Sequence, residues 1–446
     1  MLPQEFLDRM KETLGGEYEA FLASYDQPKY QALRLNALKR DDRGRRAAAC
    51  LGEGGLFAHL TPVPWAENGY YYETGDQPGK HPYHEAGVYY IQEPSAMAPA
   101  ELLEVSPGDR VLDLCAAPGG KSTQLAAKLD GKGFLLCNEI HPARAKILSE
   151  NIERMGIGNA CVTNETPAHL AEVLPVYFDK ILVDAPCSGE GMFRKNEAAC
   201  EEWSPENVQL CAQRQREILD CAASMLRPGG RLVYSTCTFS EEEDEGSIRR
   251  FLTDHPDFTL IIEKRLWPHK VKGEGHYMAV CLKAGDPESG VRGMALTGSN
   301  KPVPERELDQ FFAFCEETLS SDCVIGDRKA QYLRFGDNLY LAPEGMPGLK
   351  GLKVLRPGLH LGELKKNRFE PSHALAHFLS PADVQNSVSY ESTEKRIADY
   401  LNGQTFSYEG EKGWYLVCVD GFSLGWGKLA GNVMKNHYPK GLRVNF

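Results

Sequence analysis

The stretch Val111-Leu112-Asp113-Leu114-Cys115-Ala116-Ala117-Pro118-Gly119-Gly120-Lys121 decides the fold that this sequence predicts. Its apolar first part, residues 111–114, suits a strand that is buried on both faces. Pro118-Gly119-Gly120 favours a tight turn, and residues 122–129 have the composition of a helix. Small side chains in such a turn let a ligand approach the backbone closely. We therefore interpret the loop between strand and helix as a ligand cradle.

The residues that follow the turn indicate which ligand this cradle suits. Gly120-Lys121-Ser122 imitates the end of a nucleotide-triphosphate loop, but that pattern also requires a glycine where Cys115 stands. After the helix, residues 134–138 predict a second strand, and Glu139 follows it. A carboxylate at this place in a doubly wound sheet binds ribose hydroxyls. The pattern favours a nucleoside cofactor, although taken alone it also fits a tight connection in any α/β protein.

Length and composition describe an ordinary globular protein of several domains. A chain of 446 residues exceeds the size of a single core, and 42% hydrophobic with 25% charged residues is a usual balance. We find no apolar run of about 18 residues, and the first residues resemble no secretory signal, so we expect a cytoplasmic protein without a membrane partner. The 13 cysteines include no CxxC pair, which predicts reduced thiols rather than disulfides or a zinc module.

The charge distribution leaves the nature of the partner open. A net charge of −12 argues against a nucleic-acid partner if it is taken globally. Residues 347–369 nevertheless carry six cations against the single acid Glu363, and no acid follows Asp420. These local basic faces are compatible with binding a polyanion, and equally with solvation alone. The cations are Lys350, Lys353, Arg356, Lys365, Lys366 and Arg368, followed near the end by Lys428, Lys435, Lys440 and Arg443.

Helices and strands alternate through the middle of the chain, which predicts a mainly parallel sheet. We expect a small leading domain in residues 1–80 and the α/β domain in residues 81–285. The glycine- and proline-containing sequence of residues 284–306 is typical of a linker. An intermediate domain in residues 307–375 and a β-rich domain in residues 376–446 complete the expected order.

Several local patterns predict elements around this core. Residues 141–155 favour a helix, and another helix begins at Ser204-Pro205 and ends at Pro228-Gly229-Gly230, before a strand at residues 231–235. Two apolar segments, residues 258–262 and 277–282, predict a hairpin that closes the sheet.

Two polar patterns need no metal ion to explain them. Ser240 and Glu243 match a capping box, which accounts for the acidic run 241–245 by helix-dipole stabilisation. The spacing His81-x-x-His84-Glu85 stands in loop text without further ligands. Because metal sites need three or four ligands, we expect no metal.

Two further strand ends bring cysteines to the cradle. The first carries Asp184-Ala185-Pro186-Cys187, and the second carries Ser235-Thr236-Cys237. In doubly wound sheets, ligands bind at the carboxyl ends of the strands. A lone cysteine there is more often a small buried hydrophobe than a nucleophile. Two of them at neighbouring strand ends, one after Asp-Ala-Pro, favour a chemical role.

Three segments together resemble the RNA cytosine-5 methyltransferases of the Nol/Nop/Sun group: residues 112–122, 184–195 and 234–238. The resemblance spans about residues 86–283 and implies a Rossmann-like, S-adenosylmethionine-dependent methyltransferase core. The leading domain and the tail 421–442 resemble bacterial ribosomal RNA enzymes of the RsmF type, which end in a PUA-like domain. The resemblance implies RNA as the partner, namely 16S ribosomal RNA or the small ribosomal subunit, and a monomeric enzyme.

The same resemblance implies roles for individual residues. Cys237 would be the nucleophile, Cys187 would assist release, and Asp184 would serve both catalysis and cofactor binding. In one respect the chain departs from the family, which often offers another carboxylate to the adenine at the place of residues 162–166. S-adenosylmethionine would contact Cys115, Ala116, Ala117, Pro118, Gly119, Gly120, Lys121, Glu139, Arg144 and Asp184.

Physical chemistry explains why such an enzyme needs two thiols. Carbon 5 of cytosine is a poor nucleophile until a thiolate adds to carbon 6, and covalent catalysis divides this hard step into easier ones. A free cysteine has a pKa of about 8.5, so Cys237 needs activation by its surroundings. Asp184 could bond the cytosine edge as charge develops, and Cys187 could remove the carbon 5 proton before release. The base must also be unstacked and extruded.

Other classes of protein remain possible at this point. A methyltransferase acting on DNA or protein would share the cradle without needing the second cysteine. A non-catalytic RNA-binding protein would keep the C-terminal module but lose Cys237 or the glycine loop, and both are present. Another RNA, such as transfer RNA, is an alternative substrate.

Overall fold

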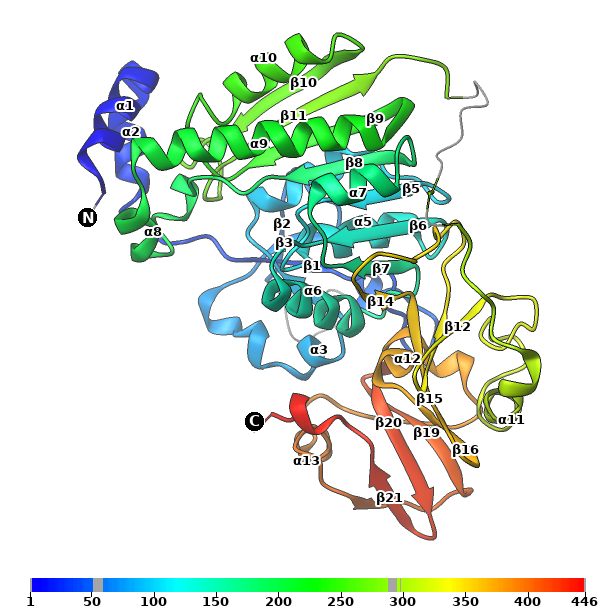
Figure 1. Ribbon diagram of the computed structural model, residues 1–446. Helices are drawn as coiled ribbons and strands as arrows, with labels where there is room; N and C mark the ends of the chain where they lie inside the picture. Colours follow the sequence, from blue (N-terminus) through cyan, green and yellow to red (C-terminus); the bar gives the residue numbers. More distant parts are fainter. Residues whose placement is uncertain (1, 51–58, 288–294, 297, 445–446) are drawn as a thin grey trace.

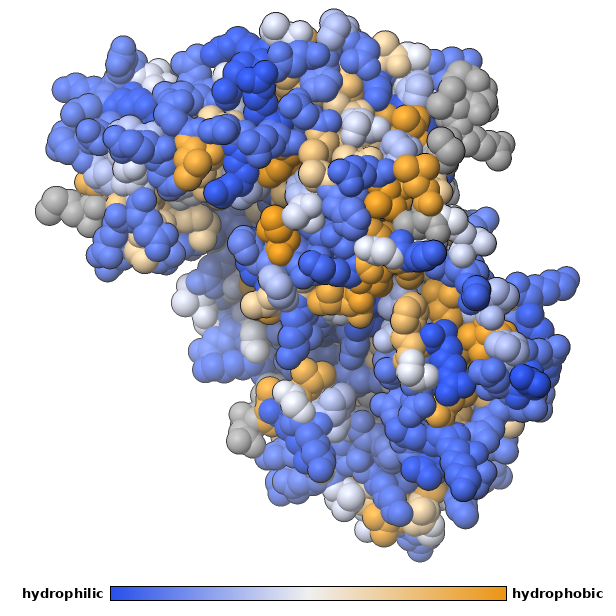
Figure 2. Space-filling view, in the orientation of Figure 1, coloured by the Kyte–Doolittle hydropathy of each residue, from blue (hydrophilic) through white to orange (hydrophobic). Residues whose placement is uncertain are grey.

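The computed structural model describes residues 2–50, 59–287, 295–296 and 298–444. A central sheet with helices on both faces occupies the middle of the molecule, and the C-terminal strands form a second body beside it (Figure 1). Within the described ranges, no helix is both long and apolar enough to cross a membrane. Hydrophilic side chains cover most of the face drawn in Figure 2, and hydrophobic ones form smaller patches.

The central sheet has eight strands in the order β10-β11-β9-β8-β5-β6-β7-β14. Its middle strands from β9 to β7 are parallel, whereas β11 pairs antiparallel with β9, and β14 with β7. The predicted mainly parallel sheet and the predicted closing hairpin are therefore confirmed. The strands are β5 (Arg110–Asp113), β6 (Phe134–Asn138), β7 (Ala160–Thr163), β8 (Phe178–Asp184), β9 (Leu226–Thr236), β10 (Phe258–Leu266), β11 (His276–Lys283) and β14 (Val354–Pro357).

Helices bury the apolar side chains of both sheet faces. On one face, Leu125 and Leu148 belong to a fully buried cluster with the strand residues Val111 and Leu135. On the other face, a second cluster joins Leu219 to strand residues such as Ile181. The first face is covered by α4 (Ala98–Leu102), α5 (Gly120–Leu129) and α6 (Pro142–Arg154), and the second by α7 (Pro167–Val173), α9 (Pro205–Met225) and α10 (Glu245–Asp254).

The structure corrects two local predictions. Pro228-Gly229-Gly230 does not end a helix, because α9 stops at Met225 and β9 already begins at Leu226. The predicted capping box is also wrong, because α10 begins at Glu245, and no side chain caps it. The Glu243 carboxylate instead lies buried against the loop after β8, where it accepts a hydrogen bond from the backbone of Ser188 at 3.0 Å.

The N-terminal segment is packed onto the core. It contains α1 (Gln4–Leu14), α2 (Tyr18–Ser24) and a sheet of order β2-β3-β1-β4. Its strands are β1 (Ala32–Leu35), β2 (Thr61–Pro62), β3 (Gly69–Tyr71) and β4 (Tyr89–Ile91). Because β4 pairs with β1, this sheet crosses the expected boundary between residues 80 and 81. Two buried cations connect this segment to other parts of the chain. Arg34 donates to Thr123 of α5 at 2.6 Å, and Lys39 donates to Ser423 near the C-terminus at 3.0 Å.

The C-terminal part holds two further sheets and the helices α11 (Asp309–Thr318), α12 (His373–Phe378) and α13 (Lys395–Leu401). One sheet has the order β12-β13-β15-β16 and the other β17-β19-β20-β21-β18. The expected β-rich end is thus confirmed. The strands are β12 (Tyr332–Phe335), β13 (Asn338–Leu341), β15 (Leu359–Lys365), β16 (Arg368–Pro371), β17 (Ser387–Tyr390), β18 (Phe406–Ser407), β19 (Gly413–Val419), β20 (Phe422–Ala430) and β21 (Val433–Asn436).

The strand β14 connects this C-terminal part to the central sheet. It covers the edge of β7, and exposed sheet edges are templates for unwanted pairing. Its Arg356 is buried against α6, where the guanidinium contacts the Glu153 carboxylate and donates to Ser149 Oγ at 3.1 Å. The segment beyond the linker therefore stabilises the core sheet through β14.

We predict that Arg356→Met lowers the free energy of unfolding by about 1.5–3 kcal/mol, because it removes a buried charged hydrogen bond and leaves Glu153 unpaired. Chemical denaturation of the full chain measures this change. Lys350→Met is the matched control, since Lys350 is exposed in the same segment and should change stability by less than about 0.5 kcal/mol. Equal stability of the two variants would contradict the role given to β14.

Candidate active site

The cradle loop connects β5 to α5 and is held by backbone contacts. Ala116 donates its N–H to the carbonyl of Asn138 at 2.8 Å, at the end of the neighbouring strand β6. Gly119, which precedes α5, has a φ of +113°, and a Cβ there would lie 3.1 Å from a methyl group of Leu148. A Cβ on Gly120 would lie 3.2 Å from the Gln92 side chain. The positive φ therefore favours glycine at position 119, and a Cβ at position 120 would require the Gln92 side chain to shift by a few tenths of an ångström.

A buried carboxyl group lies beneath this loop. Asp113 accepts a hydrogen bond from Ser122 Oγ at 2.6 Å, whereas its Oδ1 has no hydrogen-bond partner among the described residues. Burial raises the pKa of Asp113 to about 7, and Ser122 opposes that rise. Buried polar atoms are nearly always paired, so an unpaired oxygen beneath a glycine loop fits a cradle that a polar ligand completes.

The structure brings Glu139 and Arg144 to the same loop, as predicted. Glu139 follows β6, is 3% exposed and accepts a hydrogen bond from the His141 N–H at 2.9 Å. Arg144 Nη1 lies 3.5 Å from the Glu139 carboxylate. Its Nη2 donates to the carbonyl of Ala117 at 2.9 Å. Arg144 thus connects the carboxylate after the second strand to the cradle.

The polar residues at the place of the family's adenine-side carboxylate make contacts within the protein. Asn164 donates its side-chain amide to the carbonyls of Glu139 at 2.7 Å and Ile140 at 2.8 Å. The adjacent Glu165 carboxylate accepts the Lys353 N–H at 2.6 Å and lies 2.8 Å from a His169 ring nitrogen. The Glu165 carboxylate therefore holds the residue that precedes β14. The Asn164 side chain lies beside the end of β6.

Asp184 ends β8 and lies between the cradle and the cysteines. Its Oδ2 accepts a hydrogen bond from Lys121 Nζ at 2.7 Å, and its Oδ1 accepts one from Ser235 Oγ at 2.8 Å. Burial alone would raise the pKa of Asp184, but Lys121 and His276 together hold it well below its usual range. The carboxylate is therefore ionised, and with 31% of its side chain exposed it can meet a ligand.

His276 is a member of this group that sequence reasoning missed. It begins β11, is 2% exposed, and its Nε2 lies 3.4 Å from Asp184 Oδ1. Burial, and after it the positive charge of Lys121, lower the pKa of His276. The predicted strand began at Tyr277, one residue too late to include it. The available signal was its place directly before a strand of the predicted closing hairpin.

The two predicted cysteines are close together. Their sulfur atoms are 3.5 Å apart, and either thiol can donate to the other. Gly191 donates its N–H to the carbonyl of Cys237 at 2.7 Å, and a Cβ on Gly191 would lie 2.7 Å from that oxygen. The contact with Cys237, and after it burial, raises the pKa of Cys187 well above its ordinary value. The loops after β8 and β9 are thus fixed to each other.

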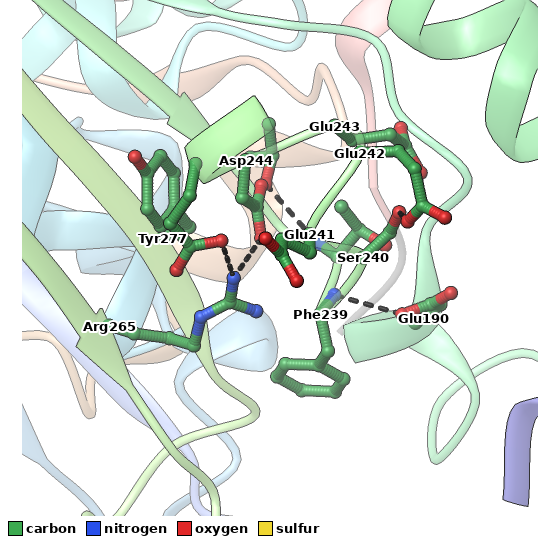
Figure 3. A network of polar contacts seen from close by, with 12 residues as sticks. Glu190, Phe239, Ser240, Glu241, Glu242, Glu243, Asp244, Arg265 and Tyr277 are labelled. Atoms are coloured by element: carbon green, nitrogen blue, oxygen red, sulfur yellow. Dashed lines mark hydrogen bonds and ion pairs between the residues drawn. The ribbon is translucent and has the colours of Figure 1, made fainter. Parts of the chain in front are cut away.

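The acidic run supports these loops from behind (Figure 3). Besides Ser188, the Glu243 carboxylate accepts a hydrogen bond from Gln215 Nε2 of α9 at 2.8 Å. Asp244 accepts one from Thr236 Oγ1 at 2.5 Å and lies 2.9 Å from Arg265. Buried carboxylates in this arrangement order the segment that contains Cys187 and Cys237. Among the described residues, no group of three or more His, Cys, Asp and Glu side chains could hold a metal ion.

The Glu190 carboxylate also orders these loops, and it connects them to the N-terminal helix α1. It is fully buried and accepts hydrogen bonds from Trp203 Nε1 at 2.8 Å and from the Phe239 N–H at 2.9 Å. Arg9 of α1 forms an ion pair with the same carboxylate. Sequence reasoning included Glu190 only within a quoted motif and gave it no role. Its partners are distant in sequence, so no local pattern signals them.

We predict a pH-dependent stability difference between the wild type and Glu243→Gln. Burial raises the pKa of Glu243 from its ordinary 4.5 to about 7, so the folded state retains this proton longer than the unfolded chain. The contribution to stability is complete below pH 4.5 and is lost as the pH rises to about 7. The free energy of unfolding of the wild type, relative to the variant, should fall across this window by on the order of 2 kcal/mol.

Denaturant titrations at several pH values measure this difference. Glu241→Gln is the control, because Glu241 is exposed in the same acidic run. A constant difference between the wild type and Glu243→Gln would show that Glu243 does not titrate in this window.

The fold and this arrangement of residues define a Rossmann-like methyltransferase, and the comparisons with known proteins identify its family. Residues 100–282 match the family described as 16S rRNA methyltransferase RsmB/F. Residues 2–94 match the N-terminal domain of 16S rRNA methyltransferase RsmF. Residues 313–379 match the first C-terminal domain of RsmF rRNA methyltransferase, and residues 387–444 match the methyltransferase RsmF PUA domain.

Curated relatives match along nearly the whole chain. The ribosomal RNA small subunit methyltransferase F of Vibrio cholerae is 32% identical over 474 residues, covering 99% of this chain and 97% of the relative. The enzyme of the same name from Escherichia fergusonii is also 32% identical, with coverage of 99% and 96%. The chain therefore belongs to the ribosomal RNA small subunit methyltransferase F family.

Solved structures agree with the core fold. A methyltransferase homologue from Pyrococcus horikoshii is 27% identical, with a TM-score of 0.54, and covers 63% of this chain and 95% of that one. The structure of NSun6 from the same organism, determined with SFG, has a TM-score of 0.54 at 23% identity and covers 64% and 99%. It supports the fold alone. At the level of the family, an S-adenosylmethionine-dependent RNA cytosine-5 methyltransferase with a PUA domain is confirmed.

Proposed function

We propose that this protein methylates carbon 5 of a cytosine in 16S ribosomal RNA through a covalent bond to Cys237. The observation that carries the proposal is the thiol pair at 3.5 Å beside the ionised Asp184, at the strand ends next to the glycine cradle. A methyltransferase that needed no covalent step would have no use for a second thiol in this place.

S-adenosylmethionine would be held by the loop 115–121 together with Glu139, Arg144 and Asp184. The fit rests on the two glycines, where a Cβ would make tight contacts, and on the unpaired Asp113 Oδ1 beneath the loop. When bound, this cofactor supplies an electrophilic methyl group. The buried Glu139 carboxylate after β6 is the group that suits ribose hydroxyls.

The contact between the two thiols places a possible hydrogen-bond donor at the sulfur of the proposed nucleophile. The Cys187 thiol can donate to the Cys237 sulfur, and this contact is the first cause of the raised pKa of Cys187. The Cys237 thiolate then adds to carbon 6, while Lys121 and Asp184 bind the polar edge of the base. Once the Cys237 sulfur is bonded to carbon it no longer carries a negative charge. The partly exposed Cys187 thiol can then pass its proton to solvent water, and its thiolate can remove the proton from carbon 5. The electron pair of that carbon–hydrogen bond re-forms the double bond between carbons 5 and 6, and the carbon 6–sulfur bond breaks to release the Cys237 thiolate.

The segments outside the core would bind the surrounding RNA. We propose domains at residues 1–80, 81–285, 307–375 and 376–446, with the first and last contacting phosphates. In the basic stretch 347–369, the charges of Arg356, Lys365 and Arg368 are paired with carboxylates. Phosphates would therefore meet the exposed Lys350 and Lys366, and the exposed Lys435, Lys440 and Arg443 near the C-terminus. We further propose a cytoplasmic monomer.

Bisulfite sequencing of ribosomal RNA tests the proposed substrate. A strain without this gene should lack one or more 5-methylcytosines in 16S RNA, and the wild-type gene should restore them. The Cys237→Ala gene, expressed at the same level, should not restore them. If the 16S pattern is unchanged and a methylcytosine is lost from transfer RNA, then 16S RNA is not the substrate, although cytosine methylation by this protein is supported.

We predict that the two cysteine variants differ in the covalent species they accumulate. Cys237→Ala should abolish both methyl transfer and any protein–RNA adduct, because no thiolate attacks carbon 6. Cys187→Ala should permit attack and methylation but slow proton removal, so a denaturant-stable RNA adduct that carries the methyl group accumulates. A denaturing gel with radiolabelled cofactor measures both. An adduct in Cys237→Ala, or exchanged phenotypes, would assign the nucleophile to the other cysteine.

We also predict that Glu139→Ala weakens S-adenosylmethionine binding about tenfold or more, through loss of about 1.5–3 kcal/mol of charged hydrogen bonding. Calorimetry on the full-length protein gives the dissociation constant. Glu150→Ala is the control, because Glu150 is an exposed carboxylate on the following helix α6. Equal affinity in Glu139→Ala and wild type would remove Glu139 from the cofactor site.

A further inference from the structure

The sheet register brings His276 to the polar group around Asp184. Met278 of β11 pairs with Ser235 of β9, and Ser235 pairs with Asp184 of β8. Side chains two residues apart on a strand point to the same face, so His276 shares the face of Met278. The result is the 3.4 Å separation between His276 Nε2 and Asp184 Oδ1. Nothing in the proposed chemistry has so far used this imidazole.

The surroundings of the ring favour its neutral form and a particular tautomer. The charged groups that act on it are Lys121 of α5, Asp184 of β8 and Glu93 from the loop after β4. Neither ring nitrogen has a hydrogen-bond partner of good geometry among the described residues. Since buried polar atoms are nearly always paired, the Asp184 Oδ1 at 3.4 Å is a natural partner for a proton on Nε2.

We propose that His276 is a positioning residue for methyl transfer, which acts by donating its Nε2–H to Asp184 and fixing the direction of that carboxylate. Lys121 holds one oxygen of Asp184, and Ser235 together with His276 holds the other. The carboxylate is 31% exposed and needs such support to present one orientation to the target base. This inference rests on the proposed role of Asp184 at the cytosine edge.

Three variants at position 276 separate hydrogen bonding from packing. In His276→Gln the amide nitrogen can reach the place of Nε2, in His276→Asn it is too short to do so, and His276→Phe keeps the ring without a donor. We expect His276→Gln to retain kcat within about threefold. His276→Asn and His276→Phe should lose about ten- to a hundredfold in kcat, with the dissociation constant of S-adenosylmethionine and the KM for RNA nearly unchanged.

A purely structural role gives a different pattern. Wild-type kcat in His276→Phe, or equal losses in His276→Gln and His276→Phe, would overturn the proposal. If the variants unfold, nitrogen NMR of the wild-type protein, with the His276 ring assigned by through-bond correlations to its own backbone, still decides it: the Nε2–H tautomer is required, and the Nδ1–H tautomer contradicts it. Failure of the proposed function would appear separately, as a wild-type protein that transfers no methyl group to cytosine.

Discussion

The parallel pairing of β8 with β9 is the constraint on which the rest of the site depends. Asp184 faces Ser235 in this pairing, so the two chains leave the sheet side by side. Each reaches its cysteine within three residues, and the Gly191 N–H bond to the Cys237 carbonyl prevents the loops from separating. The 3.5 Å between the two sulfur atoms therefore follows from strand register, which tolerates no shift by one residue without turning side chains to the other face.

The parts outside the core act on the site through buried charges. Arg34, from the N-terminal sheet, donates to the carbonyl of Gly120 at 2.9 Å, at the start of the helix behind the cradle. Arg9 of α1 pairs with Glu190 in the loop between the cysteines. Isolating the core would remove both cations and leave the Gly120 carbonyl and the Glu190 carboxylate without them. The cradle and the thiol loops are therefore properties of the whole chain, and the segment 81–285 alone lacks two of the groups that hold them.

How much the sequence predicts depends on the distance over which each interaction acts. The strand, turn and helix at residues 111–129 are encoded by local periodicity and glycines, and they appear as expected. The strand β14 was missed because its edge pairing with β7 is contributed by residues almost two hundred positions away. The capping box failed for the same reason. Its motif was local, but Glu243 gains more from Ser188 and Gln215, which only the folded chain provides.

Net charge misleads for a related reason. Of the acids that make the total −12, several never meet solvent: Glu190, Glu243 and Asp244 are fully buried. Arg9 and Arg265 neutralise two of them inside the protein, and burial raises the pKa of Glu243 to about 7. An approaching polyanion responds to the field at the surface, where internally paired groups largely cancel. In the basic stretch 347–369, three cations are likewise paired with carboxylates, so they add less to the surface field. The surface field thus depends on the exposed cations that folding leaves without carboxylate partners among the described residues, and a charge sum over the sequence does not identify them.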